Sequence, residues 1–68
     1  MELSARNQLK AKVKSVRLGT IMAEVIATIG DQEIVSAITR ASAESLNLQQ
    51  GDDVIIVIKA TEVLVAKA

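Results

Sequence analysis

Apolar and polar side chains alternate through most of this chain, with a glycine between successive runs. Leu9, Ala11 and Val13 alternate with lysines, and the run 21–29 is apolar at every second position. A period of two is typical of β-strands, because successive side chains on a strand point to opposite faces. Gly19, Gly30 and Gly51 separate the runs. The pattern predicts an all-β domain.

Five strands follow from these runs. In the first, 8–18, the apolar set moves from odd to even positions near Lys14-Ser15, which predicts a β-bulge because one inserted residue reverses the alternation. The second and third, 21–29 and 32–39, flank Gly30-Asp31, a good hairpin turn. The fourth is the continuous apolar run 54–58, which we expect to be covered on both faces. The fifth is 62–66.

Between the third and fourth strands the period changes. The stretch 42–48 predicts one or two turns of helix, with Ser42 as the N-cap and Glu44 in the first turn. This order of elements, with three strands, one helix and two more strands, is that of a five-stranded OB-like Greek-key barrel. We therefore expect residues 1–68 to form a single barrel domain with one short helix between strands 3 and 4.

The size of the chain predicts self-association. A domain of 68 residues buries only about 60% of its unfolded surface and usually needs a disulfide, a metal or a partner chain. The sequence has no Cys and no His, which excludes disulfides and the usual zinc and copper sites. Half of the residues are apolar and none is aromatic, so a core of small side chains leaves apolar surface to cover. We expect a homo-oligomer.

Several functions are disfavoured by composition. Eight acidic residues balance eight basic ones, so no net charge attracts nucleic acid or a membrane. Single-stranded nucleic-acid binders also rely on aromatic stacking, and aromatics are absent. The longest apolar run is too short to span a bilayer, and the polar start 1–4 does not resemble a targeting signal, so we expect a cytoplasmic protein. The sequence shows no constellation of acid and base side chains, so we do not expect an enzyme.

Three short polar groups offer hydrogen-bond donors and no carboxylate: 4–7, 39–42 and 59–61. Hydroxyls, a guanidinium, an ammonium and turn amides suit a tetrahedral oxyanion better than a hard cation, which prefers carboxylates. Each group also has a simpler interpretation. Ser42 alone is more often a plain N-cap, and Arg6 near a terminus is more often a solvated charge. A row of lysines such as Lys10, Lys12 and Lys14 is usually the solvent-exposed face of a strand.

The run Ser4-Ala-Arg-Asn-Gln-Leu-Lys10, followed by a small residue and a basic strand, resembles the opening signature of the molbindins, the small molybdate-binding Mop proteins. The resemblance extends over the whole chain. Gly19, the region 36–42, the stretch 46–51 and the stretch 59–63 all follow in family order. Ala11 departs from the glycine that is typical of the family, and a strand tolerates that change.

The resemblance implies a hexamer (a trimer of dimers) that binds molybdate, and often tungstate, at subunit interfaces for storage or homeostasis, with no organic cofactor and no resident metal ion. It implies that Ser4 and Arg6 come from one subunit. Thr39, Ser42, Lys59 and the backbone of Ala60 would come from its neighbour. The alternative is an OB-type nucleic-acid-binding module that uses the face formed by Lys10, Lys12 and Lys14. The choice between molybdate and tungstate, the stoichiometry and any second class of site stay open.

Overall fold

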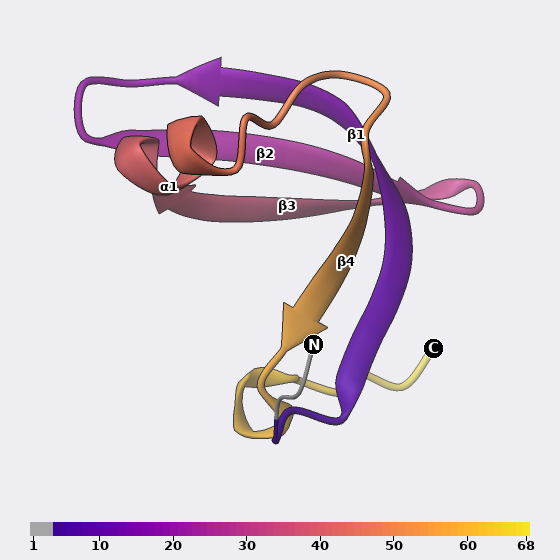
Figure 1. Cartoon of the computed structure of the whole chain (residues 1–68). Helices are drawn as coiled ribbons and strands as arrows, with labels where there is room; N and C mark the ends of the chain where they lie inside the picture. Colours follow the sequence, from indigo (N-terminus) through magenta and orange to yellow (C-terminus); the bar gives the residue numbers. More distant parts are fainter. Residues whose placement is uncertain (1–3) are drawn as a thin grey trace.

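The computed structural model describes residues 4–68; Met1 to Leu3, part of the polar start that does not resemble a targeting signal, lie outside the described residues. Four strands form one antiparallel sheet in the order β3-β2-β1-β4. They are β1 (Asn7–Leu18), β2 (Met22–Ile29), β3 (Gln32–Thr39) and β4 (Asp53–Ile58). Figure 1 shows a layer of β1, β2 and β3 from which the amino-terminal half of β1 and β4 descend together as an arm.

The bend in β1 lies where the reversed alternation predicted a bulge. Val13 pairs with Ala27 and Ser15 pairs with Ile26, so Lys14 is the extra residue between them. An inserted residue bends a strand and increases its twist. The first half of β1 therefore pairs with β4 and the second half with β2, as Figure 1 shows. One strand thus spans both parts of the fold.

The β2–β3 hairpin matches the expected bounds closely. Pairing runs from Ile29 with Gln32 to Met22 with Thr39. Gly30 occupies the turn at a φ of 63°, a left-handed conformation that an L side chain adopts only at a cost. The alternation buries Ala23, Val25 and Ala27 on one face of β2. This hairpin ends at Thr39, next to the only α-helix in residues 4–68.

The helix α1 (Arg40–Ser45) begins two residues earlier than the sequence pattern predicts. Thr39, not Ser42, is its N-cap: the Thr39 side chain accepts a hydrogen bond from the Ser42 amide. The prediction that Ser42 caps the helix is therefore wrong, and so is the placement of Glu44 in the first turn. Helix α1 buries one residue, Ala43, against the sheet.

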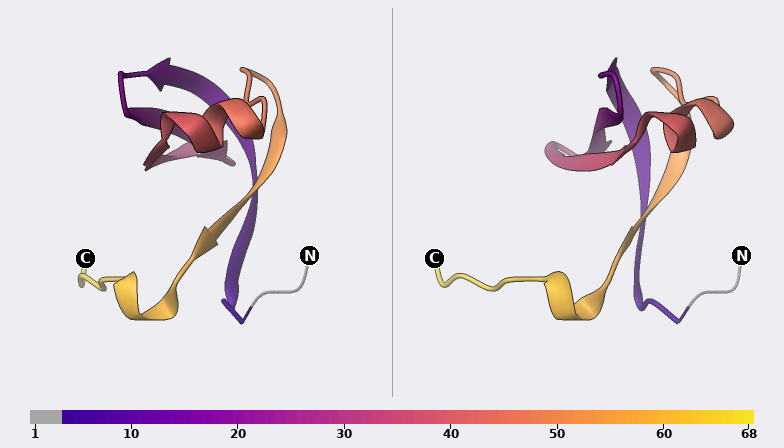
Figure 2. Two further views of the ribbon diagram at one scale, coloured as in Figure 1. Left: turned by 60° about the vertical axis from the view of Figure 1, so that its left-hand side comes forward. Right: turned by 90° about the vertical axis from the view of Figure 1, so that its left-hand side faces the viewer.

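The predicted fifth strand at 62–66 is wrong for the single chain. A 3-10 turn, η1 (Ala60–Glu62), follows β4, and residues 63–68 form no strand. A strand needs a neighbour to bond its amides and carbonyls, and η1 directs this segment away from the sheet (Figure 2). Residues 4–68 therefore form a four-stranded sheet with one short helix, and no five-stranded Greek-key barrel forms within this part of a single chain.

The core of the single chain is small. Its buried apolar residues are Ala11, Val13, Ala23, Val25, Ala27 and Ala43. The chain exposes 5669 Å², whereas a compact monomer of 7.2 kDa exposes about 4,100 Å². Its radius of gyration of 12.6 Å also exceeds the roughly 11 Å expected for its length. About 1,500 Å² of surface thus remains that a compact fold would cover. No helix in residues 4–68 is long and apolar enough to cross a membrane.

Candidate functional site

Arg6 and Lys59 lie at the same end of the arm. The β1–β4 pairing ends with Asn7 opposite Ile58, and Arg6 and Lys59 are the next residues on each strand. Both side chains are exposed, and neither makes an ion pair with any residue in the described part of the chain. Two cationic donors therefore project from one edge of the molecule. Ser4, also exposed, precedes Arg6 at this end.

The turn η1 adds backbone donors beside Lys59. Its first internally bonded amide is that of Glu62, which donates to the Lys59 carbonyl at 2.9 Å; the Val63 amide donates to the Ala60 carbonyl. The amide of Ala60 precedes these bonds. The first amides of a helical turn lack partners inside it and turn to water, side chains or ligands. The expected role of the Ala60 backbone as a donor is compatible with this geometry.

Thr39 and Ser42 form a second donor group at the start of α1. The Ser42 amide donates to Thr39 Oγ1 at 3.1 Å, and the Thr39 hydroxyl donates to Ser42 Oγ at 2.8 Å. Arg40 anchors the start of α1. Its amide donates to the Ile21 carbonyl at 2.7 Å, and its Nη1 donates to the Gly19 carbonyl at 3.2 Å. Since Ser42 Oγ accepts from Thr39, its own proton can point outward to another acceptor.

The two donor groups lie at opposite ends of β1. Thr39 pairs with Met22, beyond the Leu18–Ala23 pair at the carboxyl end of β1, whereas Arg6 precedes its amino end. Figure 1 shows the free end of the arm and helix α1 at opposite ends of the molecule. The structure therefore brings Lys59 and Ala60 together with Ser4 and Arg6, and not with Thr39 and Ser42. This differs from the grouping that the resemblance implied.

The basic face of β1 is largely paired with carboxylates. Lys12 Nζ lies 2.9 Å from Asp53 Oδ1, and Lys14 contacts Glu33. Of the three lysines, only Lys10 makes no ion pair with the described residues. A nucleic-acid surface needs cations that are available to phosphates. These ion pairs therefore disfavour the alternative function, a nucleic-acid-binding face formed by Lys10, Lys12 and Lys14.

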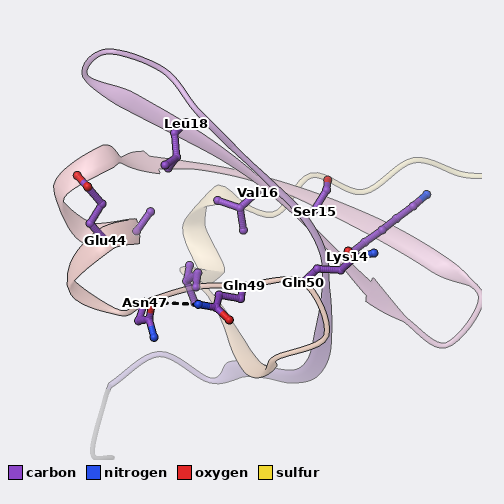
Figure 3. Close-up of a pocket in the computed structure, with 10 residues that line it drawn as sticks. Lys14, Ser15, Val16, Leu18, Glu44, Asn47, Gln49 and Gln50 are labelled. Carbon is purple, nitrogen blue, oxygen red and sulfur yellow. Dashed lines mark hydrogen bonds between the residues drawn. The ribbon is translucent and has the colours of Figure 1, made fainter.

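A cavity that sequence reasoning did not anticipate lies between the bulge of β1 and the loop after α1 (Figure 3). Its volume is about 580 Å³ and its polar lining includes Ser15, Asn47, Gln49 and Gln50. Asn47 has a φ of 50°, and Gln49 Nε2 donates to Asn47 Oδ1 at 3.3 Å. None of the six predicted site residues lines this cavity. Within residues 4–68 no cluster of three or more acidic side chains could hold a metal ion.

Comparison with known proteins identifies the family. The TOBE domain model matches residues 3–65. Molybdenum-pterin-binding protein 1 of Clostridium pasteurianum is 44% identical over 66 residues, covering 96% of this chain and 97% of that protein. A solved molybdate-binding protein from Sporomusa ovata superposes with a TM-score of 0.94 at 43% identity, covering 98% of this chain and 100% of its own.

A third relative is longer. The solved structure of ModG, described as a cytoplasmic molybdate-binding protein with molybdate bound, superposes with a TM-score of 0.84 at 38% identity. The match covers 88% of this chain and 43% of the ModG chain. The match of the TOBE model to most of the chain, and identities above 40% over whole small relatives, show that this chain belongs to the TOBE domain family and, within it, to the molbindins, or Mop proteins.

Proposed function

We propose that this protein is a non-catalytic binder of molybdate, and also of tungstate, that holds the oxyanion between copies of the chain. Membership of a family whose relatives are named for binding molybdenum or molybdate supports the choice of ligand. The observation that carries the proposal is the composition of the two donor groups. Ser4, Arg6, Lys59 and Ala60 form one, Thr39 and Ser42 form the other, and neither contains a carboxylate.

These donors match the chemistry of a tetrahedral dianion. The Arg6 guanidinium and the Lys59 ammonium offset its charge through charge-assisted hydrogen bonds, which are about twice as strong as neutral ones. The hydroxyls of Ser4 and Ser42, with the Ala60 amide, donate to its oxygens, and Thr39 positions Ser42 through its hydrogen bond to Ser42 Oγ. No bond of the anion is made or broken in this role, so the protein acts by exchanging water for fixed donors.

Each site is completed by two copies. Because the Arg6–Lys59 end and the Thr39–Ser42 corner lie at opposite ends of β1, one chain cannot direct both groups at one anion. An interface that places the end of the arm of one copy against the start of α1 of another copy would bring the two donor groups together. The roughly 1,500 Å² of excess exposed surface supports association, since a standard interface buries about 800 Å² on each partner. We infer a homohexamer arranged as a trimer of dimers.

The proposed role is intracellular storage and homeostasis of the anion. In this role the protein acts in the cytoplasm, needs no organic cofactor and contacts no membrane. Molybdate and sulfate are both tetrahedral dianions, so selection between them rests mainly on the size of the cavity that the two copies enclose. A cavity shaped for the larger anion leaves sulfate unable to reach all donors at once, and buried donors without acceptors are costly.

A thermal melt with and without molybdate tests this proposal. A ligand that binds only the folded state stabilises it by RT ln(1 + [L]/Kd), which is about 2.7 kcal/mol when the free ligand is at one hundred times Kd. We expect the melting temperature to rise with molybdate and with tungstate, and to rise less with equal sulfate. An assembly module without a ligand would melt at the same temperature in all three anions, and that result would contradict the proposal.

A further inference from the structure

The half-buried side chain of Arg40 joins the first turn of α1 to the turn between β1 and β2. Its Nη1 donates to the Gly19 carbonyl at 3.2 Å, and its Nε donates to Glu44 Oε1, one turn further along α1, at 3.3 Å. The Arg40 amide donates to the Ile21 carbonyl of the same turn at 2.7 Å. Figure 1 shows this turn and α1 at the same end of the sheet. Arg40 therefore determines how α1 lies against the β1–β2 turn.

Few other interactions hold α1 in place. The helix has six residues, of which only Ala43 is buried. A helix this short is unstable alone in water, so its position depends on tertiary contacts. The turn to which Arg40 bonds is tight by comparison, because the Gly19 amide donates to the Met22 carbonyl at 2.7 Å and leaves no room for a Cβ at Gly19. Arg40 thus connects a weakly held helix to a well-held turn.

We propose that Arg40 is a positioning residue for the oxyanion site, whose side chain holds the start of α1 so that the Ser42 hydroxyl points at the anion. Ser42 lies two residues after Arg40 and accepts a hydrogen bond from the Thr39 hydroxyl at 2.8 Å. A displacement of α1 would move the Ser42 hydroxyl without breaking that bond. The inference rests on the proposed function, because Arg40 has this role only if Ser42 contacts the anion.

Arg40 acts through its shape and not through its charge. Side chains two positions apart on a helix do not face each other, so Arg40 and Ser42 lie on different faces of α1. The Glu44 carboxylate, 3.3 Å from Arg40 Nε, also offsets the charge of the guanidinium. The planar guanidinium donates in several fixed directions, whereas the ammonium of a lysine is a single point on a flexible stem. Lysine at position 40 would therefore keep the charge and lose the connection.

Substitutions at position 40 separate shape from charge. Arg40→Lys and Arg40→Leu should each weaken molybdate binding about three- to tenfold, the effect of losing one hydrogen bond of ordinary strength, in calorimetric titrations of the assembled protein well below its melting temperature. Glu44→Gln is the matched control. It removes a charge from the same pair and keeps an oxygen that accepts from Arg40, so the affinity should change by less than about twofold. Weaker binding in Arg40→Leu but not in Arg40→Lys would overturn the assignment.

A double-mutant cycle separates positioning from a general loss of structure. In a Ser42→Ala background no hydroxyl remains to be misplaced, so Arg40→Leu should lower the affinity little further. An equal fold-loss from Arg40→Leu with and without Ser42 would overturn the assignment, because Arg40 would then act elsewhere.

The unsubstituted protein distinguishes this inference from the proposed function. Absence of molybdate binding by that protein would contradict the proposed function and, with it, the role of Arg40. Molybdate binding that both Arg40 variants retain in full would contradict the role of Arg40 alone.

Discussion

Thr39 and Ser42 are joined by two hydrogen bonds that run in sequence: the Ser42 amide donates to Thr39 Oγ1, and the Thr39 hydroxyl donates to Ser42 Oγ. The first bond caps α1. The second uses the only proton of the Thr39 hydroxyl and leaves the Ser42 proton for a further acceptor. The two hydroxyls therefore have separable roles, one in the fold and one in the proposed site.

Substitution of each hydroxyl should separate those roles. Ser42→Ala keeps the cap, because the amide of residue 42 still donates to Thr39, so the melting temperature without ligand should change little while molybdate affinity falls. Thr39→Ala removes the cap and should cost about 0.5–2 kcal/mol of stability in addition to weakening binding. Melts without ligand and titrations with molybdate measure the two effects. Equal loss of stability in both variants would contradict the division.

Removal of Arg6 should weaken molybdate binding by about 1.5–3 kcal/mol, the range for hydrogen bonds to charged groups. In affinity this is roughly one to two powers of ten. Arg17→Ala is the charge-matched control, since Arg17 is also exposed and on β1. Titration of both variants with molybdate gives the comparison. If Arg17→Ala weakened binding as much as Arg6→Ala, general charge rather than a site at the arm end would explain the affinity.

Oligonucleotide binding should be weak and should not depend on Lys10. Lys12 and Lys14 lie beside the carboxylates of Asp53 and Glu33, which lower the positive potential of this face, so the affinity should show little dependence on salt. Fluorescence anisotropy with a labelled single strand at two salt concentrations measures this. A steep salt dependence that Lys10→Ala reduces would favour the nucleic-acid alternative.

Gly19 and Gly30 should differ in the substitutions that they tolerate. Gly30 has a φ of 63° and open space where a Cβ would lie, so Gly30→Asn, which tolerates the left-handed region, should cost less than Gly30→Ala. At Gly19 a Cβ would lie 2.8 Å from the Met22 carbonyl oxygen, which is backbone and cannot turn aside. Gly19→Ala and Gly19→Asn should therefore both destabilise the fold. Chemical unfolding of the four variants checks the order.

The alternation of side chains in the sequence predicted those elements that depend on interactions between neighbouring residues. The bounds of β3 and the bulge in β1 follow from the alternation of apolar side chains, which is a property of a few neighbouring residues. The N-cap did not follow, because Thr39 and Ser42 are both good caps three residues apart. Which of these two residues caps α1 depends on where β3 ends. Bonds from Arg40 to Ile21 and Gly19, which are distant in sequence, hold that point.

The donor chemistry of the proposed site follows from the sequence, whereas its arrangement does not. The donors at Ser4, Arg6 and Lys59 suit an oxyanion, and the resemblance to the molbindins singles out these residues. Their grouping depends on the length of β1, which separates Thr39 from Lys59, and on contacts between copies. The fifth strand is a similar case. Its valines and leucine are in the sequence, but a strand forms only where another chain segment offers an edge.

We propose that this protein selects molybdate over sulfate, a smaller tetrahedral dianion. Calorimetric titration of the assembled protein with molybdate, and then with sulfate under the same conditions, tests it most directly. We expect a saturable heat with molybdate and little or none with sulfate. Equal heats for the two anions, or no heat for either, would contradict it.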